Sequence, residues 1–154
     1  MATITHLEKR RIQMEYVVPL IKDLQAILGE EVVLAALAER NRRAESQAAD
    51  AGKDVNPDFG RMVKATEGFA AGDAMDYEVI TSTDSAFDMN VFRCGYAEMM
   101  AELGGAQFGH LLICNGDFAA AGRIGMKLER SQTRMQGDDF CNFRYRPATA
   151  DPKS

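Results

Sequence analysis

Thiol and carboxylate side chains that could do chemistry together are concentrated in the second half of the chain, between positions 93 and 144. Cys94 and Glu98 are four residues apart, a spacing that places them on one face of a helix. Ala97 and Ala101 share that face, and their small side chains leave space for a ligand. The alternative is that Cys94 is a small buried hydrophobic residue and that Glu98 is solvated.

A second pair, Cys114 and Asp117, is three residues apart and follows an apolar run at 111–113. A neighbouring carboxylate raises the pKa of a thiol, so a nucleophilic Cys114 needs a nearby cation. The arginines that could supply this cation are Arg93, Arg130 and Arg144. Alternatively, Asp117 is a general base and Cys114 only lines the pocket, or Asp117 caps a short helix.

A metal site is a weaker interpretation of the same residues. Together with Cys141, the three cysteines and Asp117 could bind a soft metal such as zinc. Their positions match no recognised ligand spacing, and the chain has only two histidines, His6 and His110. No glycine-rich loop has the spacing that phosphate binding requires. We therefore expect no metal and no cofactor, with a zinc-stabilised structural domain as the alternative.

The elements in residues 1–70 are expected to be mainly helical. One apolar stripe at helical spacing comprises Val17, Leu20, Ile21, Leu24, Ile27 and Leu28. Pro19 lies within this stretch, which predicts that the helix begins or kinks there. Gly29 separates it from a second helix at 30–50, whose second half is polar all round and is expected to be solvated. A third, shorter helix is predicted at 58–70.

Residues 75–146 have a different periodicity. Alternating residues at 77–82 and 87–92 predict two strands that form a hairpin. A helix follows at 94–103, and the segment 107–122 is expected to be helical with a break near Asn115 and Gly116. The segments 125–136 and 140–146 predict a second hairpin, joined at 137–139. The order predicts a single α+β domain over residues 1–154, with helices packed on a roughly four-stranded antiparallel sheet and a frayed tail at 147–154.

Composition limits the class of protein. The chain has 154 residues and a net charge of −5, which argues against nucleic acid as a partner. No apolar run approaches the ~20 residues of a membrane span, and the N-terminus lacks the apolar core of a signal peptide. An odd number of cysteines without a secretion signal indicates reduced thiols and a cytoplasmic protein. The expected partner is a small-molecule substrate, and homo-oligomerisation is left open.

Three separated motifs carry a resemblance to a known family. FRCGYAEMMAELG, HLLICNGDF and KLERSQTRMQGDDFCNFRYRP follow one another in the order found in the L-2-amino-thiazoline-4-carboxylic acid hydrolase family. The positions that match the family pattern are Cys94, Ala97, Glu98, Cys114, Asp117, Thr133, Gly137, Cys141, Phe143 and Arg144. The family pattern has an aspartate where this chain has Asn142, which raises the question of whether a charge needed for the reaction is missing.

The resemblance implies a hydrolase that opens a small nitrogen-containing ring, such as 2-amino-thiazoline-4-carboxylate, to give an N-carbamoyl amino acid. Asp117 is the expected base or amidinium anchor, Glu98 is the second carboxylate, and Arg144 or Arg93 would bind the substrate carboxylate. Cys114 is the candidate covalent nucleophile, and the substrate site also includes Cys94, Thr133 and Cys141. We expect one cavity to be lined by Cys94, Glu98, Cys114, Asp117 and Cys141. A small-molecule-binding domain without turnover is the competing hypothesis.

Overall fold

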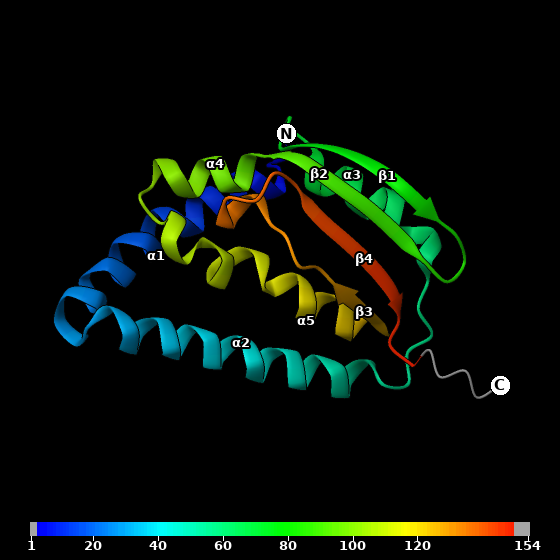
Figure 1. The fold of residues 1–154 in the computed structure, drawn as a ribbon, viewed down its shortest axis with the longest axis horizontal. Coiled ribbons are helices and arrows are strands. Elements are labelled where there is room, and N and C mark those ends of the chain that lie inside the picture. The colour runs from blue at the N-terminus through cyan, green and yellow to red at the C-terminus, as the bar shows by residue number, and fades with distance from the viewer. Residues whose placement is uncertain (1–2, 150–154) are drawn as a thin grey trace.

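Two long helices form the N-terminal half of the computed structural model, which describes residues 3–149. Helices α1 (His6–Leu28) and α2 (Glu30–Gly52) meet at Gly29, where φ is +98°, and diverge from this turn (Figure 1). A capping box starts α1: Thr5 Oγ1 accepts from the N–H of Glu8, and Glu8 Oε2 accepts from the N–H of Thr5. The expectation that the helix begins or kinks at Pro19 is wrong about the start, because α1 continues through Pro19 from His6. Water can solvate the carbonyl of Glu15 that loses its partner, since Glu15 and Pro19 are both exposed.

The buried face of α1 differs from the predicted stripe. The side chains that pack inward are Met14, Val18 and Ile21, whereas Leu20, Ile27 and Leu28 are exposed. The inward side chains join a core cluster with Met99 and Met100 of α4 (Gly95–Glu102).

One face of the second half of α2 is packed, so the expectation of a wholly solvated segment is wrong for that face. It lies along α5 (Gly116–Arg123), as Figure 1 shows, and Ala48 is buried in this contact. The two helices approach so closely that a Cβ atom on Gly52 would collide with the carbonyl oxygen of Gly122. Small residues at four-residue spacing, rather than large apolar ones, form this interface.

The sheet has four antiparallel strands in the order β1-β2-β4-β3, which confirms the predicted α+β class. The strands are β1 (Met75–Ser82), β2 (Phe87–Cys94), β3 (Met126–Glu129) and β4 (Cys141–Pro147). The first predicted hairpin, β1–β2, is present. The second is not tight, because β3 ends at Glu129 and residues 130–140 form a long connection that contains the short helix η4 (Arg134–Gln136). Of the predicted tail, Pro147 belongs to β4, and residues 150–154 lie outside the described part of the chain.

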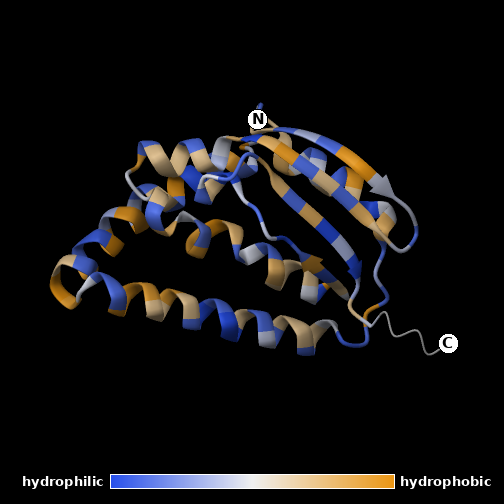
Figure 2. Ribbon diagram, viewed as in Figure 1, coloured by the Kyte–Doolittle hydropathy of each residue, from blue (hydrophilic) through white to orange (hydrophobic). Residues whose placement is uncertain are grey.

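Alternation along β2 and β4 separates a buried face from a polar one, and Figure 2 shows the alternating colours along these strands. The buried side chains are Phe87, Met89, Val91, Cys141, Phe143 and Tyr145. They pack on Met62 of α3 (Met62–Ala70), which follows the short helix η1 (Phe59–Arg61), and on Ala121 of α5. Cys94 and Met75 contact both this cluster and the cluster that α1 forms with α4, so the two cores meet at the end of β2. Within residues 3–149, no helix has both the length and the apolar character needed to cross a membrane.

Candidate functional site

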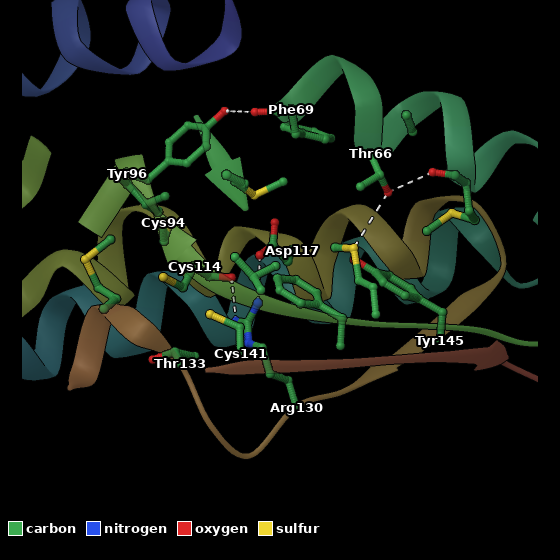
Figure 3. A pocket seen from close by; sticks show the side chains of 18 of the residues that line it. Thr66, Phe69, Cys94, Tyr96, Cys114, Asp117, Arg130, Thr133, Cys141 and Tyr145 are labelled. Atoms are coloured by element: carbon green, nitrogen blue, oxygen red, sulfur yellow. Dashed lines mark hydrogen bonds and ion pairs between the residues drawn. The ribbon is translucent and has the colours of Figure 1, made fainter. Parts of the chain in front are cut away.

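A cavity of about 130 Å³ lies where the two core clusters meet, between the buried face of the sheet and α3, α4 and α5 (Figure 3). Its wall is mostly apolar. The polar and thiol-bearing residues that line it are Arg10, Thr66, Cys94, Tyr96, Cys114, Asp117, Arg130, Thr133, Cys141 and Tyr145. Four of the five residues expected to share a cavity are among them, and Glu98 is not.

A π-helix, η3 (His110–Cys114), positions Cys114 at one side of the cavity. Such wide turns occur often at functional sites. Side chains from other elements donate to two carbonyls of this segment: Asn41 Nδ2 donates to Leu111 O at 3.0 Å, and Arg130 Nη2 donates to Cys114 O at 2.8 Å. The backbone then enters α5, so that Cys114 and Asp117 both face the cavity, as their spacing predicts.

Arg130 is the buried cation of the site. Its side chain is only 2% exposed, and its Nη1 donates to Asp117 Oδ2 at 2.8 Å. The guanidinium lies between the rings of Phe118 and Phe143, at 5.0 and 4.9 Å from their centroids. Its Nε has no hydrogen-bond partner among residues 3–149. Of the three arginines that the sequence offered as a partner for Cys114, only Arg130 lines the cavity.

Asp117 lies deep in the protein, but part of its side chain is exposed at the cavity. Its side chain is 38% exposed, and Figure 3 shows the carboxylate directed into the cavity. Burial raises the pKa of Asp117 above its ordinary value, although the charge and hydrogen bond of Arg130 and the charge of Arg10 act to lower it. A carboxylate in this setting can bind an organic cation or accept a proton from a reactant.

The three thiols converge on this carboxylate, and none is in a disulfide. Burial raises the pKa of Cys114 far above its ordinary value, outweighing the charge of Arg130. Burial also raises the pKa of Cys141, whose Sγ accepts from the N–H of Arg134 at 3.1 Å. The pKa of Cys94 is raised by burial as well, against the opposing effect of the N–H groups of Ala97 and Tyr96. All three are therefore thiols and not thiolates at neutral pH.

Glu98 and Arg93 lie outside the cavity, contrary to the roles expected for them. Cys94 is the N-cap of α4, with extended backbone (φ −128°, ψ 108°), so the four-residue rule for a helix face does not apply to Cys94 and Glu98. Arg93 donates to Glu98, Asp76 and Asp73, each at 3.0 Å. This network ties β1, β2 and α4 to the turn before β1, where Asp73 has a φ of +59°.

Arg144 and Asn142 lie on the polar face of the sheet, away from the cavity. Arg144 donates to the carbonyls of Met89 and Phe143 and to Asn90 Oδ1. The reason is the strand alternation, which directs Cys141 and Phe143 inward and the residues between them outward. Arg144 is therefore not placed to bind a ligand carboxylate in the cavity.

Thr133 does line the cavity, as expected, and its hydroxyl caps η4 by accepting from the N–H of Gln136. Tyr96 and Arg10 were not anticipated. The Tyr96 hydroxyl donates to the carbonyl of Phe69 at 2.9 Å, and burial raises the pKa of Tyr96 to about 12. Arg10 is an exposed residue of α1 that still lines the cavity, and so it lies at the cavity mouth.

The inward direction of Arg130 could be predicted from the sequence. Met126 and Leu128 are the inward residues of β3, and position 130 continues their alternation.

Among the described residues, no three His, Cys, Asp or Glu side chains are placed to hold a metal ion together.

Among solved structures, the chain is similar to the phenol-responsive sensory domain of the transcription activator PoxR, solved with phenol, at 11% identity and a TM-score of 0.46. That similarity covers 87% of this chain and 74% of the other. Comparison with curated proteins gives no match. The sequence profile of one family matches residues 9–145, which include every cavity residue named above. The chain therefore belongs to the L-2-amino-thiazoline-4-carboxylic acid hydrolase family.

Proposed function

We propose that this chain is a hydrolase that opens a small nitrogen-containing ring, such as 2-amino-thiazoline-4-carboxylate, to give an N-carbamoyl amino acid. The observation that carries the proposal is the Asp117–Arg130 ion pair, whose carboxylate is open to a mostly apolar cavity. Membership of the family supports the class of reaction.

The cavity suits a single small ring. Its volume of about 130 Å³ is close to the roughly 150 Å³ of an apolar protein cavity that holds benzene. A ring that carries an amidine is cationic when protonated, and Asp117 is the carboxylate available to pair with it. Because the surrounding wall is apolar, that attraction is stronger than it would be in water.

Asp117 then acts as the base for water in this proposal. Its carboxylate takes a proton from water as the water oxygen bonds to the ring carbon between nitrogen and sulfur. The tetrahedral adduct collapses to a carbonyl as the carbon–sulfur bond breaks. Its hydroxyl proton passes to bulk water, which balances the proton that the amidinium substrate brought, and the protonated Asp117 gives its own proton to the departing sulfur. The product is an N-carbamoyl amino acid with a free thiol, and the carboxylate is regenerated. The raised pKa of Asp117 favours this role, since a base works best when its pKa approaches the operating pH.

Arg130 is a positioning residue in this scheme, because its 2.8 Å hydrogen bond fixes one carboxylate oxygen and its charge favours the ionised form. Arg10 is the proposed partner of the substrate carboxylate. It replaces Arg93 and Arg144 in that role, since it lines the cavity and they do not. A guanidinium can bind a carboxylate through two parallel hydrogen bonds.

Covalent catalysis by Cys114 is the less favoured route, because burial keeps its thiol protonated. It would require Asp117 to remove the thiol proton before attack on the ring carbon. We assign Cys94, Cys114 and Cys141 to the substrate-binding wall. In this scheme, Cys114→Ala retains turnover, whereas a covalent route predicts that it is inactive.

Binding without turnover is the second candidate function, and the mostly apolar wall and protonated thiols favour it. The deciding experiment incubates the purified protein with 2-amino-thiazoline-4-carboxylate and follows the ring and the N-carbamoyl product by NMR. Catalytic ring opening supports the hydrolase. A ligand that binds, with resonances shifted but no product, supports the binding domain and contradicts the proposed reaction.

A further inference from the structure

Helix α1 has a second apolar face that nothing in residues 3–149 covers. Ile12, Tyr16, Leu20 and Ile27 are 61%, 77%, 44% and 78% exposed. They lie on the side of α1 opposite Met14, Val18 and Ile21, which pack into the core. Figure 2 shows hydrophobic residues at the turn that joins α1 to α2, where this face ends. A group of exposed large apolar side chains on one side of a helix is characteristic of a protein–protein contact.

The residues on this face are arranged symmetrically about Tyr16. At 3.6 residues per turn, the face within about 40° of Tyr16 comprises Lys9, Ile12, Tyr16, Leu20, Asp23 and Ile27. All six are exposed. Ile12 and Leu20 are four residues before and after Tyr16, and Lys9 and Asp23 are seven before and after it. Apart from Ile27, the residues of this face are thus paired about Tyr16: Ile12 with Leu20, and Lys9 with Asp23.

We propose that α1 docks on α1 of a second copy of this chain, antiparallel, with the two-fold axis at Tyr16. Ile12 of one copy then faces Leu20 of the other, and Lys9 faces Asp23, twice by symmetry. A two-fold interface must be self-complementary, which is the property that this face has and that a surface for an unrelated partner does not need. A parallel pair would place Lys9 against Lys9, which is unfavourable.

The charges that this arrangement uses are available. Neither Lys9 nor Asp23 forms an ion pair within residues 3–149. With the axis at Tyr16, residues 6–26 of the two helices would lie side by side, and at 1.5 Å per residue the contact would extend over roughly 30 Å. This dimer does not depend on the proposed reaction, because it rests on the surface of α1 and not on the cavity.

A charge swap tests the dimer. Sedimentation equilibrium is expected to show a dimer for the unaltered chain. Lys9→Asp and Asp23→Lys are each expected to raise the dissociation constant at least about tenfold, because each places like charges opposite one another. The double variant Lys9→Asp/Asp23→Lys restores the opposite charges and is expected to recover the dimer. A chain that is monomeric at all concentrations, or a dimer that neither single variant weakens, overturns the proposal, as does a double variant no tighter than the singles.

A cross-link at the two-fold axis gives an independent result. Tyr16→Cys is expected to form a disulfide-linked dimer under mild oxidation, because the two cysteines would lie opposite one another. Ser46→Cys is the matched control, since Ser46 is an exposed residue of the other long helix. Linkage of the Ser46→Cys chain but not of the Tyr16→Cys chain overturns the proposal. Both variants change exposed residues, so folding is checked by circular dichroism alongside.

Discussion

Replacing Asp117 with asparagine separates the two roles of the ion pair at the cavity. Asparagine has the same shape, and its Oδ1 can still accept the hydrogen bond that Arg130 donates at 2.8 Å, but the negative charge is lost. Loss of a general base costs about 10²–10⁴-fold in rate. That factor corresponds to about 3–5 kcal/mol in the activation free energy. We expect kcat for ring opening to fall by this amount.

The stability cost is expected to be smaller than the catalytic one. Removing one partner of a fully buried ion pair costs about 3–5 kcal/mol. Here the carboxylate is 38% exposed, and Arg130 keeps its bond to the carbonyl of Cys114 and its contacts with two rings. We therefore expect Asp117→Asn to lower the free energy of unfolding by about 1–3 kcal/mol, measured by urea denaturation.

Asp88→Asn is the matched control for this experiment. Asp88 is buried and, like Asp117, is paired with an arginine, here Arg146 at 2.6 Å, but it lies outside the cavity. We expect Asp88→Asn to lower the free energy of unfolding and to leave kcat unchanged. If Asp117→Asn retains near-normal kcat, or if the two variants lose activity equally, Asp117 is structural and the proposed mechanism is refuted. A rise in KM with kcat unchanged would show that Asp117 anchors the amidinium and is not the base.

Three further predictions follow from the site and the helix packing. Because ring opening needs ionised Asp117, kcat/KM should fall as the pH is lowered through the raised pKa of Asp117. Arg130→Met should raise that pKa further and so move the acid limb of the pH profile to higher pH. An acid limb that does not move would contradict the role of Arg130. Arg10→Ala should raise KM for the carboxylated ring about tenfold or more, whereas Arg11→Ala, which removes only the surface pair with Glu102, should leave steady-state kinetics unchanged. In urea denaturation, Gly52→Ala should lower the free energy of unfolding by about 2 kcal/mol or more, because the added Cβ would meet the Gly122 carbonyl. The control Gly68→Ala, where the Cβ would enter open space on α3, should raise the free energy of unfolding by about 0.5–1 kcal/mol.

Local spacing predicts the site where the backbone is regular. Cys114 and Asp117 face the same way because both lie on a helical segment, and Cys141 and Phe143 face inward because β4 alternates. The number and direction of the strands followed from the same periodicity. The family motifs indicated that these distant segments belong to one site, which the spacing within a single segment cannot show.

Local spacing fails where an element begins. Cys94 has strand-like backbone at the N-cap of α4, so its thiol turns into the cavity while Glu98 projects to solvent and pairs with Arg93. The second half of α2 was misjudged for a different reason. Its buried residues are Asn41, Ala48 and Gly52, which carry no strong hydrophobic signal, and its packing depends on how closely α5 approaches. Arg10 belongs to the site only through the position of α1, which no local pattern encodes.

The departure from the family pattern at Asn142 concerns the position of a loop and not the charge in the cavity. Asn142 Oδ1 accepts from the N–H groups of Ser131 and Gln132, at 3.0 and 2.8 Å, on the polar face of β4. A carboxylate could accept the same two hydrogen bonds, and the Ser131 hydroxyl, which now accepts from Asn142 Nδ2, could donate to it instead. Either side chain therefore holds residues 131 and 132 beside β4. Ser131 and Gln132 follow Arg130 directly in the chain, so we expect any effect of residue 142 on the site to act through the backbone next to Arg130.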